Sequence, residues 1–366
     1  MLDARFTLTA GNFRLDVALQ AGPGVTVLFG PSGSGKSLTL RCIAGLVRPQ
    51  SGRIIVDGVT VYDSAADLDL APHRRRTGFA GQSPSLFPHL TVERNVAFGL
   101  REGNRSHRLT VAARWLQRLG LEGFEQRNPR SLSGGQAQRV ALARALARGY
   151  RTLLLDEPFS ALDEALRQEL RVALAGLARE QELTILFVTH DLREAHLLAD
   201  NLAVIDHGRI LQTGDRDDVF RRPASRRVAE LLGTTNLLRG KVIRRDAAAL
   251  VVEIEGWTAW VASWYGEPDV GEDVDVVIRP ERVVIRRGEP EARNALPATI
   301  VREFDYGPNR ILEFAPDGPG PCLVADLASR PYDVLGIAAK KRWLLELPEA
   351  DLHAMPVADP FCATTQ

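Results

Sequence analysis

Residues 30–37 read Gly30-Pro31-Ser32-Gly33-Ser34-Gly35-Lys36-Ser37. The apolar run Val25–Phe29 precedes this stretch and the helical pattern Ser37–Gly45 follows it, which predicts a strand, a loop and a helix. Glycines let such a loop wrap a polyphosphate with its N–H groups pointing inward, and the helix N-terminus adds a positive dipole end. We predict that all eight residues bind nucleotide phosphates, with Lys36 at the β and γ phosphates and the Ser37 hydroxyl on Mg²⁺. The motif alone does not choose among kinases, GTPases and transport ATPases.

Two carboxylates follow a second apolar run. Thr152–Leu155 has no polar alternation, as expected of a parallel strand buried on both faces, and Asp156-Glu157-Pro158 comes directly after it. Ligands of open α/β sheets bind at the carboxyl ends of such strands. We expect Asp156 to hold Mg²⁺ through water, and Glu157 to orient the attacking water or accept its proton.

The hydrophobic pattern of the sequence changes near residue 234. Before it, apolar runs alternate with helical patterns, which predicts an α/β domain with a parallel sheet over residues 1–235 and a helical subdomain at about 83–150. After it, short β-like segments are separated by Gly and Pro, which predicts an all-β domain over 236–350, with a tail at 351–366. The β-like segments are Leu250–Ile254, Val274–Ile278, Val283–Ile285 and Ile311–Phe314.

A faint internal repeat lies in this β region. Val242-Ile243-Arg244-Arg245 before one β-like segment resembles Ile300-Val301-Arg302-Glu303 before another. Two related β units suit a pair of small barrels. Three of the five tryptophans, Trp257, Trp260 and Trp264, fall here, either as a sensing or partner surface or as large aromatics of a small β core.

A second element of glycines and a serine precedes another helical pattern. Residues 132–136 read Leu132-Ser133-Gly134-Gly135-Gln136, and the helical pattern continues to Arg148. A helix N-terminus of this kind is a second anion site, separate from residues 30–37. One nucleotide does not need two such sites on one chain, so we expect the second to close over the nucleotide held by another copy.

These residues carry a family resemblance. Leu132–Gln136, about twenty residues before Asp156, resembles the signature sequence of ABC ATPases, and three further elements stand in the family's order. Gln82 matches the Q-loop glutamine that approaches Mg²⁺ and faces the membrane partner. Ser160–Asp163 resembles the D-loop at the dimer interface, where we expect Asp163. His190 resembles the switch histidine that contacts the γ-phosphate and acts in catalysis with Glu157.

The resemblance implies a P-loop NTPase fold, ATP and Mg²⁺ as cofactors, and a head-to-tail homodimer with two ATP molecules sandwiched between the copies. The chain departs from the family at the aromatic that stacks on adenine. Phe6 and Phe13 are the candidates, and we choose Phe13, with an inward-facing strand residue as the alternative. Ala80-Gly81 also replaces the bulky residue that is common before Gln82.

The β domain resembles the OB-like accessory domain of importer subunits, often called TOBE or MOP-like. Residues 71–76 and 86–92 most resemble the molybdate-type members. The resemblance implies uptake of an oxyanion, molybdate first and then tungstate or sulfate. Iron(III), sugar and polyamine uptake remain alternatives.

Composition restricts the partners. Lys plus Arg and Asp plus Glu are both 46, so no bulk charge favours nucleic acid or anionic lipid. No apolar run approaches the roughly 18 residues that cross a bilayer, and the first residues do not read as a secretory signal. Cys42, Cys322 and Cys362 have no metal-ligand spacing and read as reduced thiols.

We therefore expect a peripheral subunit at the cytoplasmic face of the inner membrane. Its partners would be two transmembrane permease subunits and, indirectly, an extracytoplasmic substrate-binding protein. Three other functions remain open: a soluble P-loop enzyme, a ligand-responsive regulator built on the β domain, and an ABC ATPase of DNA repair or translation. The absence of an Asn-Lys-x-Asp guanine motif and of a basic excess counts against the first and the third.

Overall fold

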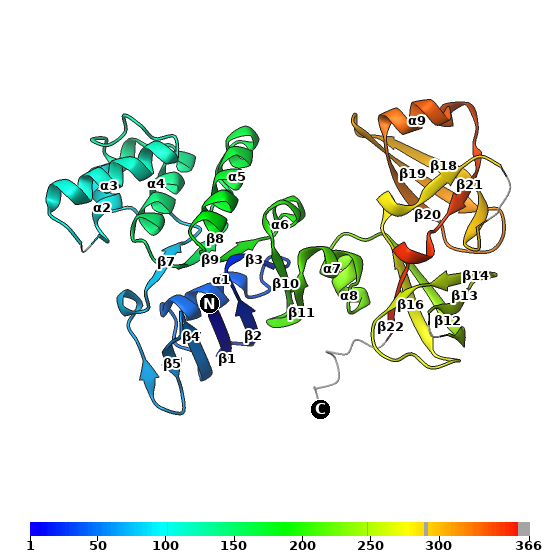
Figure 1. Ribbon diagram of the computed structural model, residues 1–366, viewed down its shortest axis with the longest axis horizontal. Helices are drawn as coiled ribbons and strands as arrows, with labels where there is room; N and C mark the ends of the chain where they lie inside the picture. The colour runs from blue at the N-terminus through cyan, green and yellow to red at the C-terminus, as the bar shows by residue number, and fades with distance from the viewer. Residues whose placement is uncertain (101, 247, 289–291, 358–366) are drawn as a thin grey trace. The chain divides into compact units, whose positions relative to one another are not determined.

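Strand β3 (Gly24–Phe29) lies inside the mixed sheet that organises the first half of the computed structural model (Figure 1). The structure describes residues 1–100, 102–246, 248–288 and 292–357. The chain divides into two compact units, Met1–Arg216 and Asp217–Gln366. The domain boundary that we placed near residue 235 stays a prediction. The expected tail covers residues 351–366, and its last part, residues 358–366, lies outside the described ranges.

The sheet of the first unit has the strand order β6-β5-β4-β1-β2-β11-β10-β3-β9-β8-β7. Its other strands are β1 (Leu2–Ala10), β2 (Phe13–Ala21), β4 (Ser51–Val56), β5 (Val59–Asp63), β6 (Leu68–Asp69), β7 (Thr77–Ala80), β8 (Thr152–Asp156), β9 (Thr184–Thr189), β10 (Asn201–Asp206) and β11 (Arg209–Asp215). Strands β10, β3, β9, β8 and β7 pair in parallel, and every residue of β8 and β9 is buried. The apolar runs without alternation therefore predicted β3 and β8 correctly, and the run Thr184–Val188 is of the same kind and forms β9. No such run indicated β7 or β10, and the antiparallel strands β1, β2, β4 and β5 were not predicted.

The helices of this unit are α1 (Lys36–Ala44), α2 (Val92–Ala97), α3 (Arg105–Arg118), α4 (Gly134–Ala147), α5 (Glu164–Glu180) and α6 (Leu192–Leu198). Helices α2, α3 and α4 gather at one end of the unit, within the range predicted for the helical subdomain (Figure 1). None of the helices in the described ranges is long and apolar enough to cross a membrane.

A buried arginine fixes the C-terminal end of α1. The Arg75 side chain is fully buried and donates from Nη1 to the carbonyls of Cys42 and Ile43, at 2.8 and 3.0 Å. Its Nη2 lies 2.7 Å from Asp69 Oδ1. A cation at the negative end of the helix dipole is stabilising, and these carbonyls have few partners within the helix. Arg75 therefore helps to hold the helix whose opposite end carries Lys36.

The second unit contains two β-sheets, with strand orders β14-β13-β12-β16-β22-β15 and β17-β21-β18-β19-β20. The strands are β12 (Asn236–Arg245), β13 (Leu250–Ile254), β14 (Trp257–Val261), β15 (Ser263–Trp264), β16 (Asp273–Ile278), β17 (Val284–Arg286), β18 (Ala295–Asp305), β19 (Asn309–Pro316), β20 (Leu323–Ala328), β21 (Arg342–Glu346) and β22 (His353–Pro356). Helices α7 (Arg216–Arg221), α8 (Arg226–Leu231) and α9 (Ser329–Leu335) complete this half of the chain. Short 3₁₀ segments lie at Pro72–Arg74 and Pro129–Ser131 in the first unit, and at Pro280–Arg282, Ile337–Ala339 and Glu349–Asp351 in the second. Strand β22 places part of the expected tail inside a sheet.

The internal repeat appears as two hairpins with the same irregularity. The pairing of β12 with β13 shifts register between Val242 and Arg244, and that of β18 with β19 shifts between Ile300 and Arg302. These positions are equivalent in the two repeated sequences. The internal repeat therefore has the same β-bulge in both hairpins, in addition to a similar sequence. The α/β unit followed by a β-rich, OB-like unit agrees with the predicted fold class.

Two of the three clustered tryptophans pack against the core of the second unit. Trp257 and Trp264 pack against its buried apolar residues. Trp260 is half-buried, with the guanidinium groups of Arg244 and Arg293 over its ring, at 4.6 and 4.4 Å from the centroid. Trp257 and Trp264 therefore fit the interpretation as large aromatics of a small β core, whereas Trp260 contacts arginine side chains instead.

Candidate functional site

The loop between β3 and α1 is shaped by two glycines in left-handed conformations. Gly33 has φ +82° and Gly35, at the N-cap of α1, has φ +104°. Gly30 has no room for a side chain, because an added Cβ would lie 2.0 Å from the Ile205 carbonyl oxygen. The eight predicted phosphate-binding residues therefore form one tight turn into a helix N-terminus, as the sequence predicted.

Lys36 is folded onto this loop. Its Nζ donates to the carbonyl oxygens of Gly30 and Pro31, both at 2.8 Å. Burial lowers the pKa of the ammonium, and the charges of Glu157 and Asp156 partly oppose that shift. Among the described residues, the hydrogen bonds printed for the buried Lys36 ammonium go to two neutral carbonyls, so a phosphate oxygen would offer it a stronger, charged acceptor.

Ser34 adds to the fit for phosphate. Ser34 is buried, and its Oγ has no hydrogen-bond partner among the described residues. A buried hydroxyl without a partner is costly, so a phosphate oxygen here would satisfy a group that the protein leaves open.

Ser37 and Asp156 meet at the predicted Mg²⁺ position. Ser37 Oγ donates to Asp156 Oδ1 at 2.8 Å, which joins the start of α1 to the end of β8. Burial raises the pKa of Asp156, the charge of Glu157 raises it further, and the Ser37 hydrogen bond lowers it. A buried carboxylate beside a hydroxyl is the kind of hard oxygen pair that Mg²⁺ selects.

Glu157, His190 and Gln82 converge next to this pair. His190 Nδ1 lies 2.7 Å from Glu157 Oε1, and Gln82 Nε2 donates to Glu157 Oε2 at 3.3 Å. Glu157 adopts φ +47°, a conformation that costs a non-glycine residue about 1 kcal/mol or more and often marks functional sites. The three side chains follow the adjacent strands β8, β9 and β7, so parallel pairing explains why they meet.

Gln138 belongs to this site, and the sequence reading passed over it. It is buried on α4, and its Nε2 donates to the Glu157 carbonyl at 2.8 Å. Its Oε1 accepts from the Ala161 backbone N at 3.1 Å. One amide thus ties α4 to the backbone on both sides of Ser160. A glutamine two residues after Gln136 is a weak sequence signal, because only the fold reveals what it contacts.

The predicted trans element begins α4. Ser133 is the N-cap, with Gln136 N donating to Ser133 Oγ at 3.2 Å and Ser133 N donating to Gln136 Oε1 at 3.0 Å. Leu132, Gly135 and Gln136 are half-buried, whereas Ser133 and Gly134 are exposed. Among the described residues, no hydrogen bond or ion pair joins Leu132–Gln136 to residues 30–37 of the same chain.

Asp163 and Phe13 are the remaining predicted residues. Asp163 is exposed at the N-cap of α5, where its Oδ1 accepts from Leu166 N at 3.0 Å. Phe13 begins β2 beside the phosphate loop, since a Cβ added to Gly35 would lie 3.1 Å from the Phe13 Cζ. Phe6, the other aromatic candidate, is buried in the sheet core. Phe13 therefore lies beside the loop, but it is also a strand residue packed against the core of the first unit, which is the alternative interpretation, so its contact with adenine stays a prediction.

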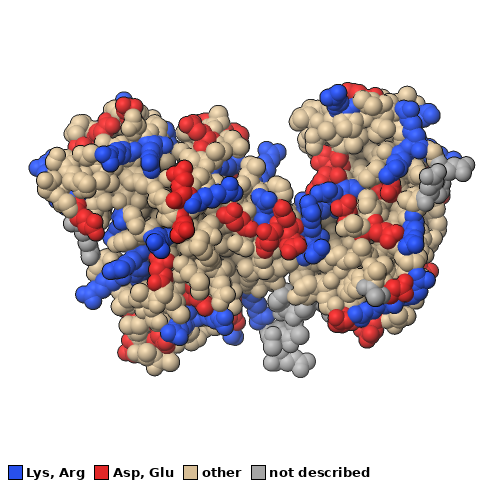
Figure 2. Space-filling view, in the orientation of Figure 1, with Lys and Arg blue, Asp and Glu red and all other residues tan. Residues whose placement is uncertain are grey.

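Charged groups are intermixed on the surface. Figure 2 shows basic and acidic side chains alternating over the visible face of each unit, without a broad field of one sign. This pattern agrees with the equal totals of 46 cationic and 46 anionic residues.

Several known proteins are similar in sequence to this chain. The family model described as "ABC transporter" matches residues 14–160. The chain is 38% identical to a molybdenum import ATP-binding protein of Paramagnetospirillum magneticum, over 82% of this chain and 84% of that protein. It is 35% identical to another of Rhodospirillum rubrum, over 92% and 93% of the two lengths. It is 41% identical to a spermidine/putrescine import ATP-binding protein of Rubrobacter xylanophilus, over 80% and 76%.

A solved structure resembles more than half of the chain. It is a dimeric, post-hydrolysis state of an ATP-binding cassette bound to ADP and phosphate, and its sequence is 30% identical to this one. The match has a TM-score of 0.52 and covers 59% of this chain and 99% of that one. The likeness therefore extends over one whole cassette.

Proposed function

This chain belongs to the ATP-binding subunits of importer-type ABC transporters, and we propose that it powers uptake of an oxyanion, molybdate first. The observation that carries the ATPase mechanism is the contact of Glu157 with both His190 and Gln82 at the ends of adjacent parallel strands. The oxyanion is supported by the molybdenum import relatives, one of which matches over nearly its whole length. The polyamine import relative makes polyamine uptake the second candidate, followed by tungstate, sulfate, iron(III) and sugar.

The loop residues would hold ATP and Mg²⁺. Lys36 would leave the carbonyls of Gly30 and Pro31 for the β and γ phosphates, and Ser34 Oγ would gain an acceptor. Ser37 and Asp156 would hold Mg²⁺, Asp156 through water and with Gln82 nearby. When bound, the metal neutralises charge that develops on the phosphates.

Glu157 would act on the attacking water. Its carboxylate orients the water or accepts its proton, while His190 fixes that carboxylate and contacts the γ-phosphate. Gln138 holds the Glu157 backbone from α4. These residues supply base, orientation and charge stabilisation from one chain.

A second copy would complete each site. Ser133 and Gly134 are exposed at the start of α4, and Asp163 is exposed at the start of α5. Among the described residues, Leu132–Gln136 makes no hydrogen bond to its own phosphate loop. A head-to-tail dimer would place this helix start on the ATP of the partner, where its N–H groups favour anionic phosphate. The dimeric cassette structure, at 30% identity, supports this arrangement.

An apolar groove of the first unit is the surface that we assign to the permease. It has a volume of about 480 Å³ and is lined by Leu46, Phe79, Phe87, Phe98 and other residues. Phe98 is 61% exposed, and Phe79 lies three residues before Gln82. A permease segment docked here would sense the Q-loop and would hold the subunit at the cytoplasmic face of the membrane.

Substitution Ser133→Arg tests the shared site. It introduces a bulky cation at the exposed helix start, so hydrolysis should be lost while each chain still binds ATP. The measurements are phosphate release and binding of a fluorescent ATP analogue. Unchanged hydrolysis would favour a soluble P-loop enzyme that works as a single chain.

The substrate is tested with the complete transporter. The chain is co-purified with its permease, placed in proteoliposomes with the cognate binding protein, and assayed with molybdate, tungstate, sulfate and spermidine. Stimulation of ATP hydrolysis by molybdate supports the proposal, and stimulation by spermidine alone overturns it. Titrating the subunit with the same oxyanions tests whether the β-rich unit senses ligand.

A further inference from the structure

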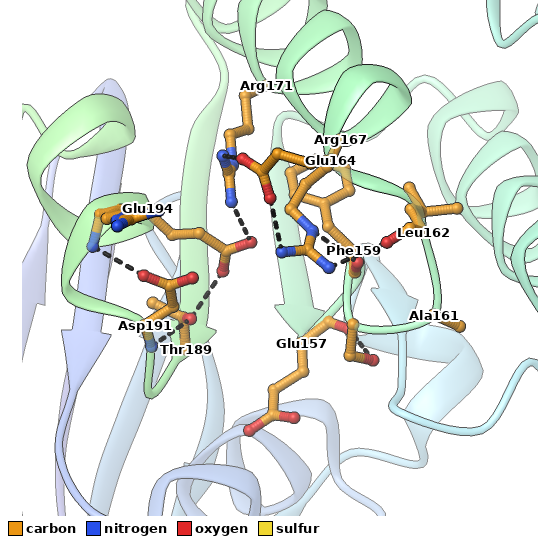
Figure 3. Close-up of polar contacts among 12 residues, drawn as sticks. Glu157, Phe159, Ala161, Leu162, Glu164, Arg167, Arg171, Thr189, Asp191 and Glu194 are labelled. Atoms are coloured by element: carbon orange, nitrogen blue, oxygen red, sulfur yellow. Dashed lines mark hydrogen bonds and ion pairs between the residues drawn. The ribbon is translucent and has the colours of Figure 1, made fainter. Parts of the chain in front are cut away.

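A chain of buried polar groups links α5 to the loop that carries His190 (Figure 3). Arg171 on α5 donates from Nη2 to Glu194 Oε1 on α6 at 2.9 Å. The other oxygen of Glu194 accepts from Thr189 Oγ1 at 2.6 Å. All three residues are buried. A buried ion pair depends on its remaining hydrogen bonds, so these three groups specify one another's positions.

Thr189 transfers this constraint to His190. Thr189 ends β9, and its Oγ1 also accepts from the backbone N of Asp191 at 3.0 Å. Asp191 is the N-cap of α6. One hydroxyl therefore ties together the residues immediately before and after His190, and the Glu194 carboxylate holds that hydroxyl.

The opposite end of this series of polar contacts reaches residues 159–162, which follow Asp156 and Glu157 in the sequence. Arg171 Nη1 donates to Glu164 Oε1 at 3.2 Å, and Arg167 Nη1 donates to Glu164 Oε2 at 3.0 Å. Arg167 also donates to the carbonyls of Phe159 and Leu162, at 3.3 and 2.8 Å. In Figure 3 these groups form a continuous path from this segment to the loop that carries His190.

We propose that Glu194 and Arg171 are positioning residues that hold His190 against Glu157 and couple that contact to residues 159–163. The inference rests on the proposed function, in which residues 160–163 lie at the dimer interface. Contact with the partner would then reach His190 through Arg167, the Glu164 carboxylate that bridges the two arginines, and Arg171. Neither positioning residue touches nucleotide.

A purely stabilising role fits these groups less well. Arg171 Nε is buried without a hydrogen-bond partner among the described residues, and such a group costs stability. Well-packed apolar side chains often replace a buried ion pair with no loss of stability. These groups therefore lower the stability of the fold, and in return they fix the geometry next to the catalytic histidine.

The first test removes the Thr189 hydroxyl. Thr189→Val keeps the shape of the side chain but breaks the bonds to Glu194 and Asp191, so kcat should fall by about 10²-fold, the size of effect that a misplaced group produces, while ATP affinity stays unchanged. Thr189→Ser restores the hydroxyl and should recover most of the activity. Leu174→Ala, a core change on the same helix α5, controls for loss of stability. Wild-type kcat in Thr189→Val would overturn the proposal.

The second test measures the coupling. Arg167→Met and Glu194→Gln are made singly and together, and kcat is compared in a double-mutant cycle. The proposal predicts that the two effects are not additive, because both residues act through one path. Additive effects would overturn the coupling to residues 159–163. If the wild-type chain does not hydrolyse ATP, the proposed function fails; if it does and Thr189→Val does too, only this inference fails.

Discussion

His190 Nδ1 lies 2.7 Å from Glu157 Oε1 although 33 positions separate the two residues. They meet because β8 and β9 are parallel neighbours, so the residues after each strand emerge at the same edge of the sheet. Gln82, after β7 on the other side of β8, reaches the second oxygen of the same carboxylate. Glu157 therefore has a partner from the strand on either side of its own.

Substitution Glu157→Gln tests the role of that carboxylate. The amide keeps the size of the side chain but cannot accept a proton from water, so turnover should fall by at least about 10²-fold. ATP binding should persist, and the unhydrolysed nucleotide should hold two copies together. Phosphate release and size-exclusion chromatography with ATP measure both effects. Glu180→Gln, at an exposed position of α5, is the control. Rapid hydrolysis by Glu157→Gln would remove Glu157 from its role.

Substitution Gln138→Leu tests the support behind Glu157. Leucine fills similar space but leaves the Glu157 carbonyl and the Ala161 N–H without their partner. The Glu157 backbone already has a strained φ of +47°, so we expect the carboxylate to shift and kcat to fall by about tenfold to a hundredfold. ATP affinity should be unchanged. The matched control is Gln117→Leu on α3, where the side chain is exposed. Equal activity of the two variants would contradict this role.

Substitution Asp156→Asn separates binding from stability. Burial raises the pKa of Asp156 in the folded protein, so its ionisation at neutral pH opposes folding of the nucleotide-free chain. Asparagine removes that cost, and the variant should unfold at a higher temperature than the wild type near pH 7. This difference in unfolding temperature should shrink as the pH falls toward the ordinary pKa of a carboxyl group, because Asp156 of the wild type is then neutral. Mg²⁺-dependent ATP binding should be lost. A lower unfolding temperature at pH 7 would contradict the argument.

The parts of this site that the sequence predicted are local. Residues 30–37 and Asp156-Glu157 are short patterns next to apolar strands, and the chain itself places them at strand ends. The roles of Gln138, Glu194 and Arg171 depend on contacts between elements that only folding brings together. Their sequence contexts read as ordinary helical faces, so periodicity gave no signal for them.

The strands at the other side of the sheet were missed for a different reason. β1 and β2 alternate buried and more exposed residues, the pattern of antiparallel strands with one solvated face. Uninterrupted apolar runs mark only strands that are buried on both faces, so they give no signal for β1 and β2. The predicted parallel sheet was therefore correct for β10, β3, β9, β8 and β7, while the whole sheet is mixed.

A buried histidine makes the second unit sensitive to acid. His353 Nε2 lies 3.2 Å from the Pro223 carbonyl, an acceptor, so Nε2 carries a proton and Nδ1 accepts from Ser263 Oγ at 2.9 Å. This pair of bonds suits the neutral ring. Burial lowers the pKa of His353 from 6.5 to about 4. The unfolded chain therefore binds more protons between these two values, and stability should fall as the pH decreases through this window, by up to about 3 kcal/mol.

Tryptophan fluorescence can follow this unit alone. Four of the five tryptophans lie in it, and Trp115→Phe removes the fifth. In that background, unfolding by urea is measured from pH 8 to pH 4 with and without His353→Gln, which stays neutral throughout. The wild type should lose stability below pH 6.5, and the variant should lose less, whereas His107→Gln at an exposed position should follow the wild type. Parallel curves for wild type and His353→Gln would show that another group titrates, because a histidine kept neutral by folding makes the wild type lose stability relative to the variant as the pH falls from 6.5 toward 4.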